Sequence, residues 1–358
     1  MIGITGTKGK TTTAFMIKNI LEKNGFKIGM IGTVGILYED KLIETDNTTP
    51  ESYVINEILC DMVEKGITHV IMEVSSQSLK YGRVYGLKFN YGIFTNIAPE
   101  HIGTNEHTDF NDYFNSKLMI FENSDYAVIN KDTDYINDII SKCEDNNVKY
   151  VMSGSENYNL KAKGAYNQEN ARLAYAFSKV INSDLIKSKE AIEDTVVPGR
   201  CEVVYKNDDY TVVVDFAHEA NGAKNFLSTM KLENPKRLVT IFGCGGNRSK
   251  DRRYGMGEVA GKLSDFVILT ADNSRFEKTM DIIKDIETTL SKYKKKDDLD
   301  NGYIIIEDRR EAIKYAIDNH KKGDLICVIG KGHETMTEAN GIKTRFLDSE
   351  EILRIING

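Results

Sequence analysis

The chain has 358 residues, of which 41% are hydrophobic, and it carries a formal net charge of −7 at pH 7. A chain of this length can form more than one hydrophobic core, so we expect two domains. The negative charge offers no general attraction for nucleic acid or for an anionic membrane surface. We therefore expect neither as a partner, and local basic groups must hold any anionic substrate.

The cysteines and the apolar runs indicate a cytoplasmic protein with reduced thiols. The five cysteines are scattered, odd in number and without a Cys-x-x-Cys pair, which argues against a disulfide framework or a zinc site. No apolar run approaches the roughly 18 to 20 residues of a membrane span. No charged and then apolar signal segment precedes the first expected strand,.

In the first half of the chain, short β-rich runs alternate with longer amphipathic stretches. The β-rich runs predict buried strands over residues 1–5, 27–33, 69–74, 91–95 and 126–130,. Apolar residues at three- and four-residue spacing predict helices over residues 10–24, 50–65, 109–121 and 167–181,. This alternation is typical of β/α crossover units, so a mostly parallel sheet covered by helices is expected.

A polar stretch and then the pair Pro198-Gly199 interrupt this pattern,. We place the domain boundary there, with one domain over residues 1–197 and a second over 198–358. In the second domain, strands are expected over residues 201–205, 211–215, 238–242, 266–270, 303–306 and 325–329,. The first two of these strands are close enough to form a hairpin, so this α/β domain should have a mixed sheet. The charge run at 292–300 is interpreted as a solvated loop.

The segment from Gly3 to Thr12 places a glycine-rich turn between a strand and a helix. Backbone N–H groups of such a turn can surround phosphate oxygens, and the helix N-terminus adds a favourable dipole. Lys10 would neutralise terminal phosphates, and the Thr11 hydroxyl would be available to Mg²⁺. Ile4 stands where the standard P-loop pattern has glycine, so a plain strand-to-helix turn is the alternative. The expected nucleotide-binding residues are Gly6, Thr7, Lys8, Gly9, Lys10, Thr11 and Thr12.

Polar residues also follow two other predicted strands. Glu73 lies at the end of the strand over 69–74, where loops of a parallel sheet gather around ligands,. A buried carboxylate there needs a cation, but a helix cap or a salt bridge explains this residue equally well. His101 lies beyond the strand over 91–95. Judged alone, it is better explained as a plain loop histidine than as a metal ligand.

Many short motifs occur in a fixed order along the chain. They are Thr5-Gly6-Thr7-Lys8-Gly9-Lys10-Thr11-Thr12-Thr13, Asn47-Thr48-Thr49-Pro50, Met72-Glu73-Val74-Ser75-Ser76, Thr95-Asn96, Asp112-Tyr113-Phe114-Asn115-Ser116-Lys117, Gly199-Arg200, Asp215-Phe216-Ala217-His218, Phe242-Gly243-Cys244-Gly245-Gly246-Asn247-Arg248, Asp272-Asn273-Ser274-Arg275 and Gly330-Lys331-Gly332-His333-Glu334. With these motifs the chain resembles the Mur ligase family, in particular its UDP-N-acetylmuramoyl-tripeptide synthetase type. The resemblance implies a P-loop central ATPase domain with a mostly parallel sheet and a C-terminal Rossmann-like α/β domain.

The family's reaction implies roles for several of these residues. Its members phosphorylate a carboxylate with ATP and let an amine attack the acyl phosphate, releasing ADP and phosphate. By resemblance, Thr11 and Glu73 hold one Mg²⁺, whereas Glu73, His101 and Lys117 form a second metal site. An ammonium cannot ligate a cation, so Lys117 would be carbamylated by CO₂. Without the resemblance, Lys117 would be an ordinary solvated lysine. The residues expected to be catalytic are Lys10, Glu73, His101 and Lys117.

The resemblance also implies three sets of ligand-binding residues. Asn167 and Asn170 would lie near the adenine, and the second domain would close over ATP through Arg200, Asp215, His218 and Arg248. The carboxylate acceptor would contact Thr48, Thr49, Ser76 and Arg83. The incoming amino acid would contact Arg253, Asp272, Asn273, Arg275, Gly330 and Glu334. Ser274 replaces the usual proline, and Gln77 replaces a usual histidine.

Family members of full length carry a further N-terminal domain that binds the uridine diphosphate end of their precursor. Met1 begins the P-loop strand here, so we expect a carboxylate acceptor other than an intact UDP-muramoyl precursor. An amino acid with a second free carboxylate, such as diaminopimelate, is the expected amine substrate. The alternatives are a nucleotide-binding switch or assembly partner without ligase activity, a fragment of a cell-wall ligase, and a ligase of the folate or polyglutamate type. The combination of Glu73, His101 and Lys117 argues against the switch.

Overall fold

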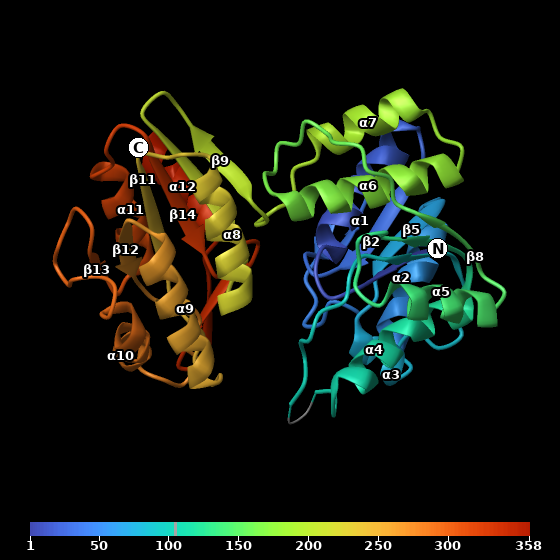
Figure 1. The fold of residues 1–358 in the computed structure, drawn as a ribbon, viewed down its shortest axis with the longest axis horizontal. Helices are drawn as coiled ribbons and strands as arrows, with labels where there is room; N and C mark the ends of the chain where they lie inside the picture. The colour runs from blue at the N-terminus through green and yellow to red at the C-terminus, as the bar shows by residue number, and fades with distance from the viewer. Residues whose placement is uncertain (104–105) are drawn as a thin grey trace. The chain divides into compact units, whose positions relative to one another are not determined.

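The structure is a computed structural model that describes residues 1–103 and 106–358. The chain forms two compact units (Figure 1). Unit 1 consists of Met1–Lys161 and Ala165–Val196, and unit 2 consists of Ala162–Gly164 and Val197–Gly358.

The described part of unit 1 contains one eight-stranded sheet with the strand order β4-β3-β2-β5-β1-β6-β7-β8. The strands are β1 (Ile2–Thr5), β2 (Ile28–Gly32), β3 (Gly35–Tyr38), β4 (Lys41–Ile43), β5 (His69–Glu73), β6 (Phe89–Phe94), β7 (Ser124–Ile129) and β8 (Lys149–Met152). All neighbouring pairs from β2 to β8 are parallel, whereas β3 and β4 extend the sheet as antiparallel strands. The central strand β1 therefore ends between β5 and β6, where polar side chains of all three can meet.

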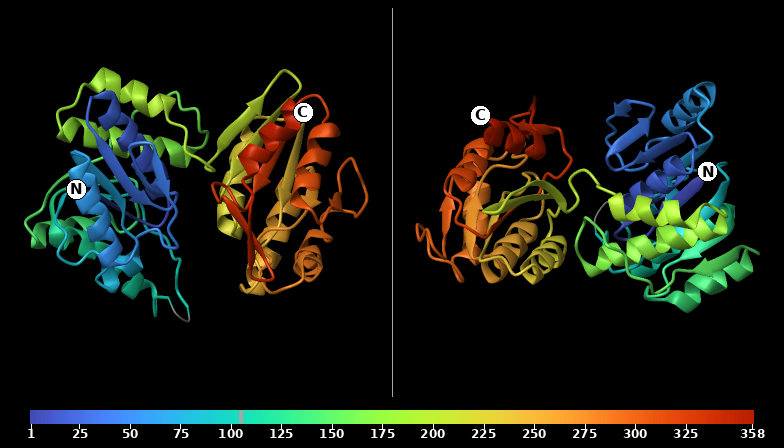
Figure 2. Two further views of the ribbon diagram at one scale, coloured as in Figure 1. Left: turned by 180° about the vertical axis from the view of Figure 1, so that it is seen from behind. Right: turned by 90° about the horizontal axis from the view of Figure 1, so that it is seen from above.

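Helices cover both faces of this sheet (Figures 1 and 2). They are α1 (Lys10–Lys23), α2 (Ser52–Glu64), α3 (Ser76–Lys80), α4 (Phe110–Leu118), α5 (Ile136–Asp145), α6 (Ala165–Val180) and α7 (Leu185–Asp194), and the 3₁₀ turn η1 (Met119–Asn123) follows α4. Helices α1, α6 and α7 contact one another on one face. On the other face, α2, α4 and α5 bury apolar side chains such as Ile55, Tyr113 and Ile139 against the strands.

Unit 2 also has a helix-covered sheet, and the strand order in its described residues is β13-β12-β11-β14-β10-β9. The strands are β9 (Glu202–Lys206), β10 (Tyr210–Asp215), β11 (Arg237–Phe242), β12 (Phe266–Leu269), β13 (Tyr303–Ile305) and β14 (Asp324–Ile329), and β15 (Met336–Ala339) pairs with β16 (Ile342–Arg345) in a separate ribbon. The helices are α8 (Ala220–Leu232), α9 (Lys250–Leu263), α10 (Thr279–Leu290), α11 (Arg309–Asp318) and α12 (Asp348–Asn357). One hydrophobic cluster joins the sheet to α8, α9 and α10, and another joins it to α11 and α12.

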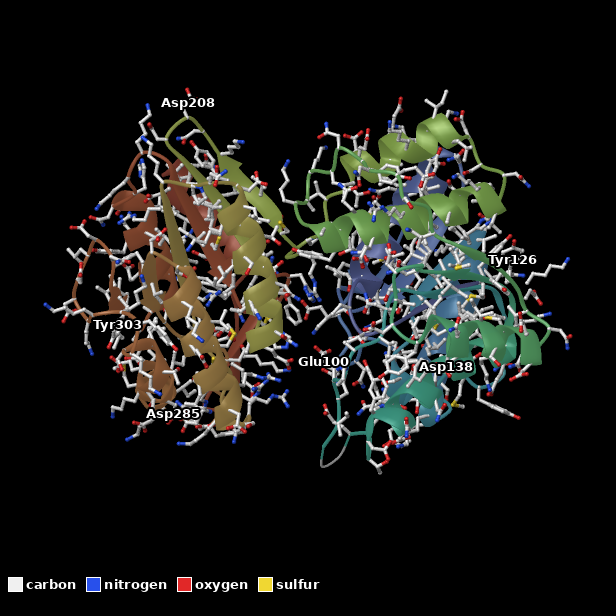
Figure 3. All side chains as sticks on the ribbon, in the orientation of Figure 1. Glu100, Tyr126, Asp138, Asp208, Asp285 and Tyr303 are labelled. Atoms are coloured by element: carbon white, nitrogen blue, oxygen red, sulfur yellow. The ribbon has the colours of Figure 1, made fainter. Side chains whose placement is uncertain are left out.

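The fold class expected from the sequence is confirmed, because both units are α/β and most strand pairs are parallel. The predicted hairpin is also present, since β9 pairs antiparallel with β10. Asp208 lies in its turn (Figure 3). The side chain of Asn207 accepts hydrogen bonds from the N–H groups of Asp209 and Tyr210 at 2.9 and 2.8 Å, which closes the turn.

Three details of the predicted elements need correction. The polar stretch after α6 contains helix α7, whose first N–H groups are capped by Asp184 and whose Ile192 is buried. Pro50 precedes α2 instead of beginning it, because Glu51 is the extended N-cap. The predicted helix over 109–121 ends at Leu118 and continues as the 3₁₀ turn η1.

Two smaller expectations can be compared with the described residues. All five cysteines are free thiols, and Cys60 alone among them is exposed. The charge run at 292–300 is a loop, but Lys294 within it is buried and donates to the Asp265 carbonyl at 3.2 Å. In the described ranges, no helix has the length and apolar character needed to cross a membrane.

Candidate active site

The glycine-rich loop of unit 1 connects β1 to α1 and has a shape that requires glycine at two positions. Gly6 has φ +138° and Gly9 has φ +83°. A Cβ atom on Gly6 would lie 2.0 Å from Oγ1 of Thr95, and one on Gly9 would lie 2.2 Å from Oδ1 of Asn170. Any other residue would therefore combine a disfavoured backbone conformation with a steric clash.

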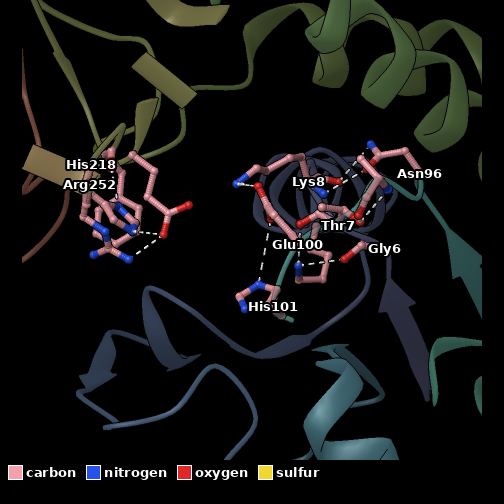
Figure 4. Close-up of polar contacts among 12 residues, drawn as sticks. Gly6, Thr7, Lys8, Asn96, Glu100, His101, His218 and Arg252 are labelled. Carbon is pink, nitrogen blue, oxygen red and sulfur yellow. Dashed lines mark hydrogen bonds and ion pairs between the residues drawn. The ribbon is translucent and has the colours of Figure 1, made fainter. Parts of the chain in front are cut away.

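The end of strand β6 holds this loop in place (Figure 4). The Thr7 N–H donates to the Asn96 carbonyl at 2.8 Å, and the Lys8 N–H donates to Oδ1 of Asn96 at 2.9 Å. The Thr95 hydroxyl donates to the Lys8 carbonyl at 2.6 Å. These bonds connect Thr5-Gly6-Thr7-Lys8-Gly9 to Thr95-Asn96, two motifs far apart in the sequence, and give the loop a fixed shape.

Two lysine amines converge on one carbonyl of the loop. Nζ of Lys10 donates to the Gly6 carbonyl at 2.9 Å and to the Thr7 carbonyl at 3.1 Å. Nζ of Lys117 donates to the same Gly6 carbonyl at 2.8 Å. The ammonium of Lys10 lies beside the N-terminus of α1, and its charge together with the helix dipole favours a bound anion such as phosphate,.

Lys117 is almost completely buried, with a relative exposure of 2%. Burial lowers the pKa of its amine well below the ordinary value, and the positive charge of Lys10 lowers this pKa further,. The Tyr113 ring lies beneath the amine, 4.6 Å from Nζ to the ring centroid. The Tyr113 hydroxyl in turn lies 3.0 Å from Oγ1 of Thr7. This environment favours a neutral amine at Lys117.

Glu73 is fully buried at the end of β5, and hydroxyl groups surround its carboxylate. The Thr11 hydroxyl donates to Oε2 at 2.9 Å and the Thr33 hydroxyl at 3.0 Å, while the Thr33 N–H donates to Oε1 at 2.9 Å. A Cβ atom on Gly32 would lie 2.3 Å from Oε1, so glycine leaves the space that the carboxylate occupies. A carboxylate and a hydroxyl are suitable ligands for Mg²⁺, so the pair Thr11 and Glu73 fits the expected ion.

The expected acceptor-binding residues lie around the same strand end. The hydroxyl of Thr48 is 3.1 Å from that of Thr33, and the buried Thr49 hydroxyl donates to the Glu73 carbonyl at 2.8 Å. Arg83 donates to the Thr49 carbonyl at 3.3 Å. The structure thus places Thr49 on the backbone carbonyl of Glu73, with Arg83 on Thr49 and Thr48 on Thr33. Ser76, the fourth expected residue, is buried in α3.

The structure does not bring His101 to the Glu73 carboxylate. The imidazole is half exposed and its nearest carboxylate oxygens belong to Glu106 at 3.4 Å and Glu100 at 3.9 Å (Figure 4). Its ring centroid lies 5.8 Å from that of Tyr113, the tyrosine that contacts Lys117. Among the described residues, no group of three His, Cys, Asp or Glu side chains is arranged to hold a metal ion.

The two asparagines expected near the adenine are buried in α6 beside the start of α1. The side chain of Asn170 donates to Oδ1 of Asn167 at 3.4 Å and accepts from the Thr13 hydroxyl at 3.3 Å. Oδ1 of Asn170 is also the atom that a side chain at Gly9 would strike. Asn170 therefore fixes the position of the phosphate loop, a role that the sequence did not suggest.

In unit 2, the expected nucleotide-contacting residues lie before β9 (Arg200), at the end of β10 (Asp215) and after β10 and β11 (His218 and Arg248). The buried Asp215 carboxylate accepts from the N–H groups of Cys201 and Ala217 at 2.7 and 2.8 Å. Burial raises the pKa of Asp215, against the opposing effect of Arg200. The Arg200 guanidinium lies 4.4 Å from the centroid of the Phe216 ring. These contacts place Arg200 and Asp215 beside one another.

His218 and Arg248 have different surroundings. Nδ1 of His218 lies 2.8 Å from the Phe216 carbonyl, and burial lowers the pKa of this imidazole. Glu219 next to it accepts a hydrogen bond from Arg252 at 2.6 Å (Figure 4). Arg248 is exposed after the Gly245-Gly246 turn.

Most residues expected to bind the amino acid gather beyond the ends of β12 and β14. The Asn273 side chain donates to Oε2 of Glu334 at 2.8 Å, and Arg275 donates to the Gly246 carbonyl at 2.7 Å. Gly330 has φ +112°, and a Cβ atom there would lie 2.8 Å from Oδ2 of Asp272. The cluster combines a guanidinium with two carboxylates, so it can bind a ligand that carries both charges.

Arg253 does not belong to this cluster. It is buried in α9 with 1% exposure and donates to Glu277 at 2.7 Å and to Asp285 of α10 at 2.8 Å. The hydrogen bonds from Arg253 to Glu277 and Asp285 raise the pKa of its guanidinium. The structure assigns Arg253 to holding α9 and α10 together.

Sequence reasoning missed two residues that complete these clusters. Thr33 supplies two of the hydrogen bonds to Glu73, and its position at the end of a strand beside β5 was the available signal. The buried Lys331 donates to the Met336 carbonyl at 2.7 Å and to Glu334 at 3.2 Å. A lysine inside the motif Gly330-Lys331-Gly332-His333-Glu334 was visible in the sequence, but its burial was not.

Comparison with known proteins identifies the family of this chain. The profile of the Mur ligase middle domain matches residues 4–203, and that of the "Mur ligase, glutamate ligase domain" matches residues 199–332. The UDP-N-acetylmuramoyl-L-alanyl-D-glutamate–2,6-diaminopimelate ligase of Clostridium perfringens (strain 13 / Type A) is 38% identical over 389 residues, which cover 100% of this chain and 78% of the relative. The ligase of the same name from Clostridium tetani (strain Massachusetts / E88) is 40% identical over 384 residues, with 99% and 77% covered.

Solved structures give the same result. A structure of a UDP-N-acetylmuramoyl-L-alanyl-D-glutamate–2,6-diaminopimelate ligase superposes with a TM-score of 0.67 at 27% identity, covering 99% of this chain and 78% of that chain. The folylpolyglutamate synthase of Mycobacterium tuberculosis complexed with ADP shares the fold, with a TM-score of 0.70 at 16% identity and coverage of 92% and 87%. The resemblance inferred from the motifs is thereby confirmed. The chain belongs to the Mur ligase family, whose members are ATP-dependent, ADP-forming ligases that join a carboxylic acid to an amino acid.

Proposed function

We propose that this protein uses ATP to convert the carboxylate of an acceptor into an acyl phosphate and joins it to an amino acid in amide linkage. ADP and phosphate are the other products. The observation that carries this proposal is a phosphate loop with the Lys10 ammonium at its Gly6 and Thr7 carbonyls. Such a position stabilises the negative charge of a phosphoryl group during its transfer.

Mg²⁺ is the proposed metal. Thr11 and Glu73 would hold it through a hydroxyl and a carboxylate oxygen that already lie 2.9 Å apart. When bound, the ion supplies positive charge at the phosphoryl oxygens. Thr33 orients the Glu73 carboxylate through two hydrogen bonds, so the chain's own contribution is to hold this ligand in one orientation,.

Lys117 is the proposed site of carbamylation. Reaction with CO₂ requires a neutral amine, and the lowered pKa of this buried lysine favours that form,. The product would be a carboxylate close to Lys10, where its negative charge would be balanced. His101 is proposed as a further metal ligand. This proposal rests on the family resemblance and not on a contact in the structure.

The proposed amine substrate is 2,6-diaminopimelate, because the relatives are named as ligases of that compound. The cluster of Arg275, Asp272 and Glu334 in unit 2 supports this choice. An amino acid offers an ammonium to the carboxylates and a carboxylate to the guanidinium, which can bind it in bidentate fashion.

The proposed acceptor ends in a glutamyl carboxylate. The relatives are named for an acceptor that ends in D-glutamate, and the polar set Thr48, Thr49, Ser76 and Arg83 lies beside the Glu73 end of β5. We expect recognition to depend on this glutamyl end more than on a nucleotide at the other end of the acceptor.

A screen of ADP release tests the proposal. Purified protein is given ATP, Mg²⁺ and pairs of acceptors and amino acids, and products are identified by mass spectrometry. L-alanyl-D-glutamate and its UDP-N-acetylmuramoyl conjugate are compared as acceptors, and diaminopimelate, lysine and glutamate as amines. ADP release should require both partners and be accompanied by a condensation product. Equal ADP release without them, and no new product, would refute ligation.

A pair of lysine variants provides the matched control. Lys10→Ala removes one of the two amines at the Gly6 carbonyl and should abolish measurable ADP release. Lys18→Ala lies in the same helix and breaks only a surface ion pair with Glu22, so its ADP release should equal that of the unmodified protein,.

A further inference from the structure

A buried serine, histidine and aspartate form a chain of contacts in unit 1. The Ser76 hydroxyl lies 2.9 Å from Nε2 of His107, and Nδ1 of His107 lies 3.3 Å from Oδ2 of Asp112. His107 has 0% relative exposure and Ser76 has 5%. The three residues come from α3, from the segment before α4 and from α4 itself.

The Asp112 carboxylate decides which nitrogen of His107 carries the proton. The Asp112 carboxylate is not aligned for a good hydrogen bond from Nδ1 of His107. If Nδ1 carried no proton, however, its lone pair would face the negative carboxylate at 3.3 Å and would be repelled. The proton therefore stays on Nδ1, and Nε2 is the accepting nitrogen. It follows that the Ser76 hydroxyl donates its proton to Nε2.

Asp112 is held as an anion, which keeps this order of donors and acceptors fixed. Its Oδ2 accepts from Nζ of Lys80 at 2.5 Å, from the Thr108 N–H at 2.9 Å and from the Thr108 hydroxyl at 3.3 Å. The hydrogen bond from Lys80 is the main reason that the pKa of Asp112 lies well below its usual range. Burial keeps His107 itself neutral by lowering its pKa.

This chain of contacts lies beside the proposed catalytic groups. The His107 ring packs edge-on against Tyr113 with 5.2 Å between centroids, and Tyr113 contacts both Lys117 and Thr7. Ser75, the neighbour of Ser76, donates its N–H to the Thr49 hydroxyl at 3.0 Å. Ser76 is therefore placed among the residues expected to bind the acceptor.

We propose that His107, oriented by Asp112 and Lys80, accepts the Ser76 hydroxyl proton in a hydrogen bond to Nε2. The Ser76 oxygen can then only accept a further hydrogen bond, and it receives one from an N–H group of the carboxylate substrate. A free serine hydroxyl can donate or accept, but here the donor capacity is already used. The site then selects acceptors whose glutamyl end is attached through an amide. This inference rests on the proposed ligase function, and Ser76 is a specificity-determining residue that His107 positions.

A substrate-and-residue cycle tests the inference. The acceptor is L-alanyl-D-glutamate, or the UDP-N-acetylmuramoyl conjugate if the screen selects it, and its analogue has an ester oxygen in place of the N–H next to the glutamyl unit. The ester should raise the acceptor KM of the unmodified protein roughly three- to tenfold, as expected for one lost hydrogen bond. In Ser76→Ala, the amide and ester acceptors should have the same KM, and the KM for ATP should be unchanged.

Two further variants make the result specific. Ser78→Ala, in the same short helix, removes a hydroxyl that donates to the Ser75 carbonyl at 2.7 Å, and it should preserve the amide-to-ester ratio. His107→Phe should reduce that ratio as Ser76→Ala does, and a thermal melt checks that it is folded. If it is unfolded, His107→Gln is used, since its carbonyl can accept the serine proton and should preserve the ratio.

The possible failures are distinct. A complete absence of turnover with every amide acceptor would contradict the proposed function. Turnover with an amide-to-ester ratio near one in the unmodified protein, or with the same ratio in Ser76→Ala, would overturn the role of Ser76 alone. An unchanged ratio in folded His107→Phe, or a lost ratio in His107→Gln, while Ser76→Ala loses the ratio, would overturn the positioning role of His107 alone.

Discussion

At the scale of single residues, unit 1 derives its chemistry from charged groups that are removed from solvent. Lys117 and Glu73 are both buried, and each is surrounded by hydrogen-bonding partners from distant parts of the chain. Removing an ammonium from water disfavours its charge, which is the main cause of the lowered pKa of Lys117,. The Lys117 amine is therefore prepared for chemistry that an exposed lysine would perform poorly.

Lys117→Ala tests this interpretation. It should lower turnover by at least about a hundredfold, the scale of losing one electrostatic group at a reacting centre, and added acetate or formate should partly restore it. In ¹³C-labelled bicarbonate, the wild-type protein should show a ¹³C NMR signal from a lysine carbamate, and Lys117→Ala should lack this signal. Wild-type turnover in Lys117→Ala, or a carbamate signal in this variant equal to that of the wild-type protein, would contradict the proposal.

The pH dependence of stability has a defined sign at this lysine. Because its folded pKa lies below the ordinary value of 10.5, the unfolded chain binds more protons between the two pKa values,. The free energy of unfolding should therefore rise with pH across that window and fall as pH drops toward the folded pKa. In Lys117→Met this dependence should be weaker, as measured by denaturant unfolding at several pH values.

Some of these residues were visible in the sequence and others were not. Gly6, Gly9 and Lys10 belong to a local motif, and their conformations follow from that motif. The hydrogen bonds from Thr33 to Glu73 and from Ser76 to His107 join residues 40 and 31 positions apart. Such contacts depend on which strands become neighbours, and local periodicity does not specify that.

At the scale of elements, the sequence predicted most of the buried strands and several of the long amphipathic helices, but it missed the buried strand β3, the strand β8 and the helix α5. It did not predict α7, because the stretch of residues 182–196 is polar overall, and of its apolar residues only Ala191 and Ile192 are buried in this helix, which contacts α1 and α6. It also did not predict the exposed strand β4, whose three residues show no burial pattern. Both elements depend on packing against neighbours more than on their own composition.

The turn from β1 into α1 provides a prediction with a matched control. Gly9→Ala places a methyl group 2.2 Å from Oδ1 of Asn170 at a positive φ, whereas Gly25→Ala has a similar φ of +88° and nothing within 4 Å. Gly25→Ala should cost about 1 kcal/mol of unfolding free energy from backbone strain. Gly9→Ala should lower the free energy of unfolding by more than Gly25→Ala does. It should also weaken ATP binding at least about tenfold, as measured by calorimetry. Equal stability and equal ATP affinity of the two variants would contradict the steric argument.

The last helix, α12, makes a second prediction at this scale. Its first residue, Asp348, is fully buried and accepts two hydrogen bonds from Arg309, at 2.7 and 2.8 Å. Arg309 also donates to the carbonyls of Ile329 and Ala271, next to the proposed amino-acid site. Asp348→Asn should destabilise unit 2 by about 3 kcal/mol, because it leaves a buried charge unpaired.

Hydrogen exchange of β12 and β14 measures this effect. Arg345→Ala is the control, since it breaks only an exposed pair with Glu350 and should change stability by less than about 0.5 kcal/mol,. Unchanged protection of both strands in Asp348→Asn would show that the pair does not hold the strand ends.

At the scale of the whole molecule, each unit has its own sheet, its own hydrophobic clusters and its own set of polar residues at the carboxyl ends of its strands. The phosphate loop and the acceptor-binding residues belong to unit 1. The mixed-charge cluster proposed for the amino acid belongs to unit 2. The proposed ligation therefore uses residues of both units.

The central claim is that the acceptor carboxylate attacks the terminal phosphate of ATP and that an amine then displaces phosphate from the acyl phosphate. The most direct test uses an acceptor whose reacting carboxylate is labelled with ¹⁸O. One labelled oxygen should appear in each phosphate released along with the amide product, as measured by mass spectrometry of the phosphate. Amide formation with unlabelled phosphate, or with AMP in place of ADP, would contradict the claim.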